Sequence, residues 1–289
     1  GRPPSAARRS SPAARRDATA AQLPQSTVSR HLKALQEHGW IVKRLEGTSS
    51  YYRLRQELDP DLRRRYELVK GRIADAAGRV GQNPDDVVLV AVTKNASIDV
   101  VRQLLALGHQ DFGENRAQQL VNRAAQIDEF RNRLASHGES APRIDLPEPR
   151  WHMIGQLQRN KVRKLVEAVR LVHSVDSLRL AEEIQTQAAK RDRVVEILIE
   201  LNLGEEQKGG IAAPAVRHLV DQIDSMLNVR VRGLMAMAPL TDDQDLVRNA
   251  FERAREVYED LKQHVRDRER VNILSMGMSQ DLEIAIECG

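Results

Sequence analysis

The feature that most constrains the fold is an alternation of short apolar runs with longer amphipathic stretches, from about residue 87 to the end of the chain. The first run, Val-Val-Leu-Val-Ala-Val-Thr at 87–93, is rich in β-branched residues, which is typical of a strand buried on both faces of a parallel sheet. The stretches with helical apolar spacing are residues 97–107, 115–136, 158–169, 177–191, 213–226 and 243–267. Strands and helices in succession indicate βαβ units, so the predicted fold class is α/β.

Polar motifs follow the predicted strands. The carboxyl ends of parallel strands meet at one face of a sheet, and a (β/α)8 barrel keeps its active site there. The motifs are Thr-Lys at 93–94, Phe-Gly-Glu-Asn at 112–115, Trp-His-Met-Ile-Gly-Gln-Leu-Gln-Arg-Asn-Lys at 151–161, His-Ser-Val-Asp at 173–176, Asn-Leu-Gly at 202–204, Arg-Gly-Leu-Met at 232–235 and Leu-Ser-Met-Gly-Met-Ser at 274–279. We therefore expect one functional face that collects these segments.

Lys94 stands at the carboxyl end of the first apolar run. A lysine in this position directs its amine into the mouth of the sheet, where desolvation can lower its pKa and leave a free amine for imine formation. An isolated lysine at a strand end more often extends into solvent along its apolar stem. The polar motifs at the later strand ends favour the functional interpretation.

Taken together and in this order, the motifs at 91–94, 112–115, 151–161, 232–235 and 274–279 resemble the YggS/PROSC family of pyridoxal phosphate (PLP) homeostasis proteins, over residues from about 59 to 289. The resemblance implies a TIM barrel of the alanine racemase N-terminal type. It also implies that PLP is held as a Schiff base on Lys94, with a role in vitamin B6 and amino-acid homeostasis and no robust catalytic turnover. PLP-dependent apoenzymes are the partners that such a role suggests.

The chemical groups of PLP suggest further site residues. Its phosphate needs backbone N–H groups and small hydroxyls at the start of a helix. Gly277 allows close approach of the backbone, and Ser279 is placed to cap a helix beginning at Gln280. Three other residues are candidates either for contact with the cofactor ring or for hydrogen-bonded positions behind it, the last of them more weakly: Asn115, His152 and Asn202.

The carboxyl terminus departs from the family pattern. Members of the family continue with a final strand of the form Val-Arg-Ile-Gly and a short closing helix, whereas this sequence ends with Glu-Cys-Gly at 287–289. We therefore expect a barrel that lacks its eighth strand, with an open seam and two edge strands that invite pairing with another chain. The family's last strand carries an arginine and a glycine that help hold the cofactor, so PLP affinity needs a direct test.

The amino terminus has a different character. Residues 1–22 are rich in Ala, Arg, Ser and Pro without a hydrophobic period, which predicts a disordered segment. Residues 23–57 predict a helix and then a hairpin around Glu-Gly-Thr-Ser-Ser at 46–50. This order resembles the recognition helix and wing of an arsenic-repressor-type winged helix-turn-helix, without the helices that precede the recognition helix. The residues that this resemblance would place against DNA are Ser26, Thr27, Ser29 and Arg30.

Charge separates the same regions. Residues 1–57 hold 11 Lys+Arg and 4 Asp+Glu, net +7, and the remaining 232 residues hold 34 and 37, net −3. The predicted barrel at 59–289 therefore has no need of a polyanion, and DNA is a candidate partner only for the amino-terminal segment. The single cysteine, Cys288, excludes internal disulfides and favours a cytoplasmic location. No apolar stretch reaches the length of a membrane span.

The sequence leaves three functions open: PLP homeostasis, a racemase-like PLP enzyme, and a PLP-responsive DNA-binding regulator. Racemisation usually needs a base on each face of the substrate Cα, and alanine racemase takes its second base, a tyrosine, from a second domain. No second domain follows the predicted barrel in this sequence, and its tyrosines lie away from the predicted strand ends. Those tyrosines are Tyr51, Tyr52, Tyr66 and Tyr258. The sequence favours the first function.

Overall fold

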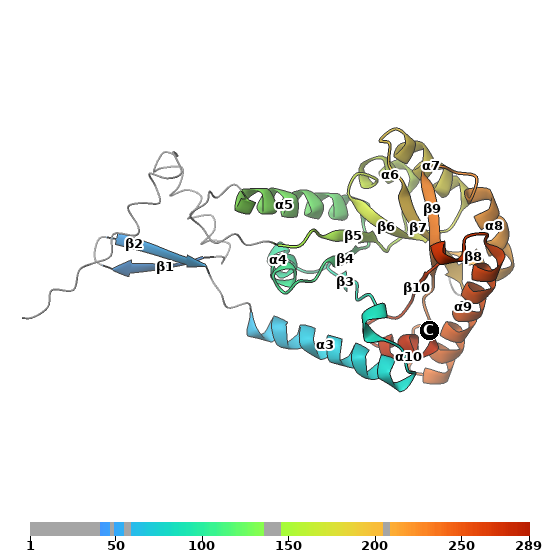
Figure 1. The fold of residues 1–289 in the computed structure, drawn as a ribbon, viewed down its shortest axis with the longest axis horizontal. Coiled ribbons are helices and arrows are strands. Elements are labelled where there is room, and N and C mark those ends of the chain that lie inside the picture. Colours follow the sequence, from blue (N-terminus) through green and yellow to red (C-terminus); the bar gives the residue numbers. More distant parts are fainter. Residues whose placement is uncertain (1–40, 47–48, 55–58, 136–145, 205–208) are drawn as a thin grey trace, which may run out of the picture. The chain divides into compact units, whose positions relative to one another are not determined.

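The structure, a computed structural model, describes residues 41–46, 49–54, 59–135, 146–204 and 209–289. Residues 61–127 and 147–289 form one compact unit, and the amino-terminal hairpin belongs to another (Figure 1). The predicted segment boundaries at 1–22, 23–57 and 59–289 remain a prediction, because residues 1–40 lie outside the described part of the chain.

The predicted hairpin of the amino-terminal region is confirmed. Strands β1 (Ile41–Glu46) and β2 (Ser49–Leu54) pair antiparallel over their whole length. A two-stranded hairpin is marginally stable alone and occurs in many folds, so it does not by itself establish a winged helix. The residues predicted to face DNA lie outside the described residues: Ser26, Thr27, Ser29 and Arg30.

The helices predicted in the barrel region are present. They are α3 (Pro60–Arg79), α4 (Ile98–Ala106), α5 (Ala117–Ala135), α6 (Arg159–Leu165), α7 (Leu178–Ala189), α8 (Val216–Ile223) and α9 (Gln244–His264), followed by α10 (Leu282–Cys288), with short 3-10 turns at η1 (Pro84–Asp86), η2 (Ala213–Ala215) and η3 (Arg268–Arg270). The start of α9 illustrates the local cause: the carboxylate of Asp243 accepts the backbone N–H groups of Asp245 and Leu246, which the helix itself leaves unpaired.

The strands form a parallel sheet whose spatial order follows the chain. They are β3 (Ala91–Val92), β4 (Asp111–Glu114), β5 (Arg150–Met153), β6 (Val169–Val175), β7 (Val195–Asn202), β9 (Val229–Met235) and β10 (Ile273–Ser275), and the short β8 (Ile211–Ala212) pairs with β7 outside this path. Sequential order with a helix after nearly every strand is the arrangement of a (β/α)8 barrel. Within the described residues no strand joins β10 to β3, so the prediction of a barrel without its closing strand is confirmed.

β3 is shorter and more exposed than the sequence predicts. Only Ala91 and Val92 of the apolar run pair with β4, and Val88 and Val92 are 62% and 50% exposed. The prediction of a strand buried on both faces is therefore wrong. The physical reason is the position of β3 at the end of the sheet, where it has one strand neighbour and its other side lacks cover.

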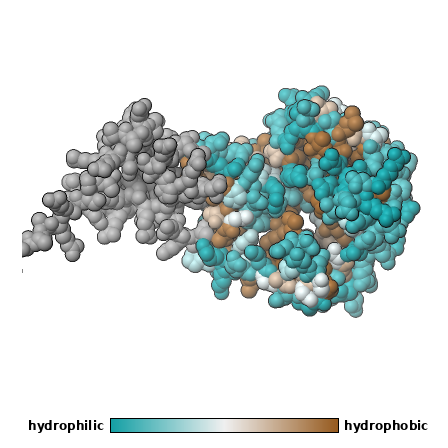
Figure 2. Space-filling model, viewed as in Figure 1, coloured by the Kyte–Doolittle hydropathy of each residue, from teal (hydrophilic) through white to brown (hydrophobic). Residues whose placement is uncertain are grey.

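The core lies on both sides of the sheet. Inside the barrel, Leu171, Leu198 and Met235 form a buried cluster against which Ile273 packs. Outside, α7, α8 and α9 follow one another along the strands (Figure 1). Figure 2 shows hydrophilic residues over most of the surface of the helices and hydrophobic residues mainly in the middle of this unit. This distribution follows from the amphipathic spacing of the helices.

The last helix, α10, is connected to the first helix of the barrel by ion pairs. Arg72 on α3 lies 2.5 Å from Glu283, and Arg79 lies 2.8 Å from Glu287, which also contacts Arg248 on α9 at 2.6 Å. These contacts join helices on either side of the unpaired sheet edges. No helix in the described residues is long and apolar enough to cross a membrane.

Candidate functional site

Lys94 lies two residues after the last residue of β3, as its motif predicts. It stands in a turn closed by a 2.8 Å hydrogen bond from the Ala96 N–H to the Thr93 carbonyl. The lysine side chain is exposed, so the desolvation that the sequence suggested for its amine is absent from this structure. The amine is accessible to a carbonyl compound from solvent.

Side chains of β4 and α5 hold the backbone of this turn. Gln119 donates to the Lys94 carbonyl at 2.7 Å, and Arg123 donates to the Ala96 carbonyl at 2.6 Å. The Thr93 hydroxyl donates to the Glu114 carboxylate at 2.6 Å, which lies 3.0 Å from the Nε of Arg123. We call Thr93, Glu114, Gln119 and Arg123 the lysine clamp. It surrounds the turn while leaving the Lys94 side chain free.

Glu114 is the buried centre of the lysine clamp. It has no solvent exposure, and burial raises its pKa, while the Thr93 hydroxyl and the Arg123 guanidinium partly oppose that shift. Its Oε2 and the Nη1 of Arg123 are buried with no hydrogen-bond partner among the described residues. The sequence interpretation missed both residues. The available signal was the glutamate that ends the short strand Asp-Phe-Gly-Glu, because a carboxylate in a buried strand needs partners.

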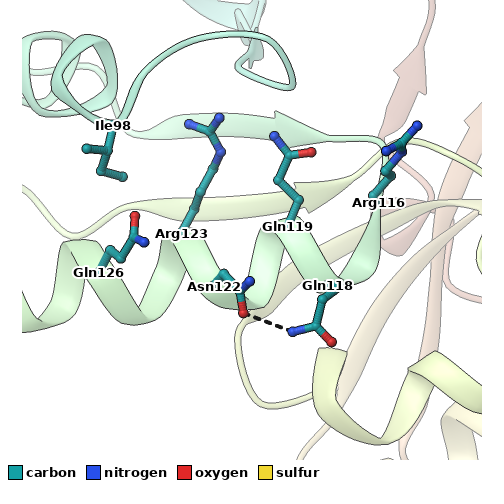
Figure 3. Close-up of a pocket in the computed structure, with 7 residues that line it drawn as sticks. All are labelled: Ile98, Arg116, Gln118, Gln119, Asn122, Arg123 and Gln126. Carbon is teal, nitrogen blue, oxygen red and sulfur yellow. Dashed lines mark hydrogen bonds between the residues drawn. The ribbon is translucent and has the colours of Figure 1, made fainter.

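A polar groove of about 550 Å³ lies beside the lysine clamp on the surface of α5. Figure 3 shows Gln119 and Arg123 projecting from the same side of that helix, with Ile98 at the start of α4 nearby. The other residues that line the groove are Arg116, Gln118, Asn122 and Gln126. The groove borders the lysine clamp, because Gln119 and Arg123 belong to both.

Asn115 follows the last residue of β4 and is partly buried. The loop after β5 packs on its backbone: a Cβ atom added at Gly155 would lie 2.4 Å from the Asn115 carbonyl oxygen. The Gly155 carbonyl in turn accepts the Ser174 hydroxyl at 2.5 Å. The strand-end motifs of β4, β5 and β6 thus meet at one face, as predicted, and only glycine fits at position 155.

His152 is inside β5 and buried, and both of its ring nitrogens have protein partners. Its Nε2 lies 3.0 Å from the Asp111 carboxylate, and its Nδ1 lies 2.9 Å from the Nε2 of His173. The Nδ1 of His173 lies 2.8 Å from the Ser275 hydroxyl. Of the two roles considered for His152, this geometry favours the hydrogen-bonded one, because both ring nitrogens already have protein partners. Asp111, His173 and Ser275 were not among the residues selected from the sequence.

The carboxylate of Asp111 determines the charges along this series of hydrogen bonds. Burial raises the pKa of Asp111, but hydrogen bonds from His152 and Arg150 outweigh burial and lower it to about 2. Burial, with the neighbouring His152, lowers the pKa of His173 to about 3. Asp111 is therefore a carboxylate and His173 a neutral imidazole near neutral pH.

Asn202 is the last residue of β7, and its amide serves the loop that follows. Its Nδ2 donates to the Gly209 carbonyl at 3.0 Å, and its Oδ1 accepts the Gly204 N–H at 3.0 Å. Gly210, at φ +89°, lies so close to the strand that an added Cβ would be 2.9 Å from the Asn202 nitrogen. Asn202 thus shapes the rim of the site.

The loop after β10 differs in detail from its prediction. Gly277 has φ +84°, and an added Cβ would lie 2.7 Å from the Ala285 Cβ, so the fold requires glycine here, while its predicted approach to a phosphate stays a prediction. α10 begins at Leu282 with Asp281 as its N-cap residue, so the predicted cap by Ser279 and helix start at Gln280 are wrong. The reason is local: the Asp281 carboxylate accepts the Met278 N–H at 2.5 Å and closes a turn before the helix. Ser279 stays exposed in that turn.

The sequence matches the family described as alanine racemase, N-terminal domain, over residues 72–287. The pyridoxal phosphate homeostasis protein of Aquifex aeolicus is 35% identical over 226 residues, which cover 78% of this chain and 91% of the relative. Curated relatives from Pseudomonas aeruginosa and Escherichia coli have the same description and are 35% and 30% identical.

Solved structures agree with this assignment. A protein described as unknown from Bifidobacterium adolescentis superposes with a TM-score of 0.69 at 31% identity, over 81% of this chain and 93% of that one. PipY of Synechococcus elongatus, solved with PLP bound, gives a TM-score of 0.62 at 32% identity, over 75% of this chain and 94% of its own. The chain therefore belongs to the alanine racemase N-terminal domain family and, within it, to the pyridoxal phosphate homeostasis proteins.

Proposed function

We propose that this chain binds PLP and takes part in cytoplasmic PLP and amino-acid homeostasis, with Lys94 as the residue that forms the Schiff base. The observation that carries the proposal is the position of Lys94: an exposed lysine at the carboxyl end of β3, on a turn whose backbone the lysine clamp holds. Family membership supports it, because relatives over most of this chain are PLP homeostasis proteins and the structure of PipY contains PLP.

The residues at the strand ends fit the chemical groups of PLP. When bound, PLP supplies an aldehyde that condenses reversibly with amines, and Lys94 offers the amine. The phosphate would lie on the loop at 275–279, where Gly277 and the exposed hydroxyl of Ser279 are the proposed contacts. Arg72 adds a nearby cation, since it donates to the Ser279 carbonyl at 3.1 Å.

Three residues are proposed to support the cofactor at the middle of the barrel face. Asn115 stands directly after β4 and is the candidate for contact with the ring substituents. His152 and Asn202 have side chains already bonded within the protein, so their proposed part is to hold the walls of the site. An exposed, reversible lysine linkage suits buffering of PLP or its delivery to PLP-dependent apoenzymes better than a closed catalytic site does.

Absorption spectroscopy tests the proposal. The purified parent is mixed with PLP, desalted, and compared with Lys94→Ala treated in the same way. We expect a Schiff-base band that survives desalting in the parent and is absent from the variant. The matched control is Lys190→Ala, which removes an exposed lysine at the C-cap of α7 and should leave the band unchanged.

Two outcomes would contradict the proposal. A band of equal intensity in Lys94→Ala would assign the linkage to another lysine. Absence of any band from folded parent protein would show that this chain does not bind PLP covalently. A racemase assay on common amino acids separates homeostasis from the enzyme alternative, for which Tyr66 and Tyr258 offer no base: they contact His109 and the Val271 carbonyl, away from the strand ends.

DNA binding by residues 23–57 is a second, separate hypothesis. The confirmed hairpin β1–β2, which corresponds to the predicted wing, and the net charge of +7 on residues 1–57 favour it. It predicts salt-dependent, site-specific binding to duplex DNA that changes when PLP is added. Binding that is absent, or that has no sequence preference and no response to PLP, would reject the regulator alternative.

A further inference from the structure

A buried chain of hydrogen bonds crosses the interior of the barrel. It runs from Asp111 on β4 through His152 on β5 and His173 on β6 to Ser275 on β10, with distances of 3.0, 2.9 and 2.8 Å. β7 and β9 separate β6 from β10 in the sheet, so the last of these bonds spans the interior instead of joining adjacent strands. It connects the edge strand β10 to the middle of the sheet.

The direction of each bond follows from the first member. Arg150 donates to the Asp111 carboxylate from its Nε at 2.8 Å and from its Nη2 at 2.5 Å. As a carboxylate, Asp111 only accepts hydrogen bonds. The Nε2 of His152 therefore carries a proton, and its Nδ1 accepts in the neutral ring. The Nε2 of His173 must then donate to it, and the Nδ1 of His173 accepts the hydroxyl proton of Ser275. The ion pair at one end thus orders the protons along the whole chain.

We propose that this proton-ordered chain positions the Ser275 hydroxyl at the start of the loop at 275–279, with its proton directed into the barrel and its oxygen lone pairs available to the loop. His173 is then a positioning residue, because it contacts the loop only through Ser275. The consequence for PLP rests on the proposed function, in which this loop receives the phosphate. The order of the protons does not depend on PLP.

One added proton reverses the chain. In the reversed state His152 carries protons on both nitrogens and donates to both neighbours. His173 accepts at Nε2, carries its proton on Nδ1 and donates to the Ser275 oxygen, which frees the Ser275 hydroxyl proton to point into the loop. The balance is one proton taken up from solvent, with the new positive charge on His152 beside the Asp111 carboxylate.

Among the described residues, two charged or titratable groups outside the histidine pair interact with His152: Asp111 on β4 and His109 before β4. Arg150 on β5 acts through its contacts with Asp111. The Nε2 of His109 lies 2.7 Å from the Asp111 backbone carbonyl, so it does not compete for the carboxylate. The partner from β10 is the uncharged Ser275. The carboxylate is therefore the group that selects the proton order.

Side-chain ¹⁵N NMR of histidine-labelled, PLP-free protein tests the order directly, with His152→Gln and His173→Gln used to assign the signals. We expect the proton of each ring to be on Nε2 at neutral pH, and a proton added to the histidine pair to move the His173 proton to Nδ1. A proton on Nδ1 of either ring at neutral pH would overturn the proposal. The exposed His218 on α8 is the control, since it lies outside this chain of hydrogen bonds.

PLP retention after desalting tests the positioning role. His173→Phe keeps an aromatic ring but removes both hydrogen bonds, and we expect about a fivefold weaker retention, the ordinary size of one lost hydrogen bond. Ser275→Ala should weaken retention by a similar factor, and the double variant should be no weaker than Ser275→Ala. His173→Gln, whose amide can donate and accept, should restore part of the loss. If the double variant loses retention by the product of the two single factors, the substitutions act independently and the proposal is overturned.

The two measurements separate the possible failures. If the parent does not retain PLP, the proposed function fails, while the NMR experiment on PLP-free protein still decides whether the chain has the stated order. If the parent retains PLP and the NMR order is as expected, equal retention by the parent and a folded His173→Phe would refute the positioning role alone. If His173→Phe does not fold, Ser275→Ala compared with the parent serves the same purpose.

Discussion

The middle of the sheet and its two edges are held together in different ways. β7 has eight residues, pairs with β6 and β9 on its two sides, and is buried over most of its length. β3 has two paired residues and one neighbour, and Val92 is half exposed. The proposed functional lysine therefore follows a short edge strand, and its turn is ordered by side chains of β4 and α5 instead of by a second ladder.

The other edge strand, β10, repeats this pattern with different partners. It has three residues and one strand neighbour, β9. The hydroxyl of Ser275 bonds to His173 across the interior, and the helix that follows is fastened by Arg72 and Arg248. The comparison teaches that apolar packing stabilises the middle of this sheet, whereas polar side chains from other elements determine the geometry at its edges. Substitutions in the middle of the sheet should act through lost apolar packing, and substitutions at its edges through lost hydrogen bonds and ion pairs.

The largest effect is expected in the middle. Ile197→Ala on β7 removes a side chain with no exposure and should lower the free energy of unfolding by about 4 kcal/mol, because the cavity in a tightly packed core does not collapse. Val92→Ala on β3 should cost less than about 0.5 kcal/mol, since that side chain is half exposed. Urea unfolding followed by circular dichroism measures both. Equal costs would mean that the edge contributes to the core as the middle does.

The next effect concerns the lysine clamp. Glu114→Gln keeps the size of the side chain but removes the negative charge that pairs with the Arg123 guanidinium, which is 11% exposed. Because burial raises the pKa of Glu114 and so favours its neutral form, the unfolding free energy should fall by only about 1 kcal/mol. Hydrogen exchange at residues 93–96 should accelerate by more than the global loss explains, because the turn loses its support. The control is Glu129→Gln on α5, the helix that carries Arg123. The carboxylate of Glu129 is 62% exposed and pairs with Arg133. Slow exchange at 93–96 in Glu114→Gln would show that the clamp is not needed.

The two carboxylates of β4 predict opposite pH dependences. The pKa of Asp111 is lowered to about 2, so its stabilisation is complete above its ordinary value of 3.8 and is lost as pH falls towards 2. Burial raises the pKa of Glu114, so the folded state holds the proton more tightly and stability from this group declines as pH rises through and above 4.5. Unfolding free energies are measured at several pH values for the parent and both variants. Asp111→Asn should lose the fall in stability towards pH 2, and Glu114→Gln should lose the decline as pH rises through and above 4.5. Unchanged profiles would contradict the assignments.

The smallest effect is expected where α3 and α10 are joined by ion pairs, beside the two unpaired sheet edges. Arg72→Ala breaks the ion pair with Glu283, but both side chains are about one third exposed, so the unfolding free energy should fall by less than about 1 kcal/mol. Faster hydrogen exchange in α10 should be the clearer sign, because α10 is short and lies next to the unpaired edge. A loss as large as that of Ile197→Ala would mean that the ion pairs, and not the core, hold the seam.

Much of the architecture was predictable from local pattern. The period of the apolar residues indicated helices such as α9, predicted at 243–267 and found at Gln244–His264, and the motif order predicted an α/β barrel that lacks its closing strand. The extent of β3 was not predictable, because its apolar run has the composition of a buried strand and only its place at the sheet edge leaves it uncovered. The start of α10 was misplaced because the Asp281 carboxylate turns back to Met278 instead of leaving Ser279 as the cap.

The sequence by itself determined the element types, the family and the lysine at the first strand end, because periodicity and motif spacing are properties of neighbouring residues. Only the tertiary structure decided which side chains support that lysine and the facing loop. Thr93 and Glu114 are 21 residues apart, and His173 and Ser275 are 102 apart. No local pattern records such pairs, because hydrogen bonding between them arises only after the sheet has curved and α5 has packed against it.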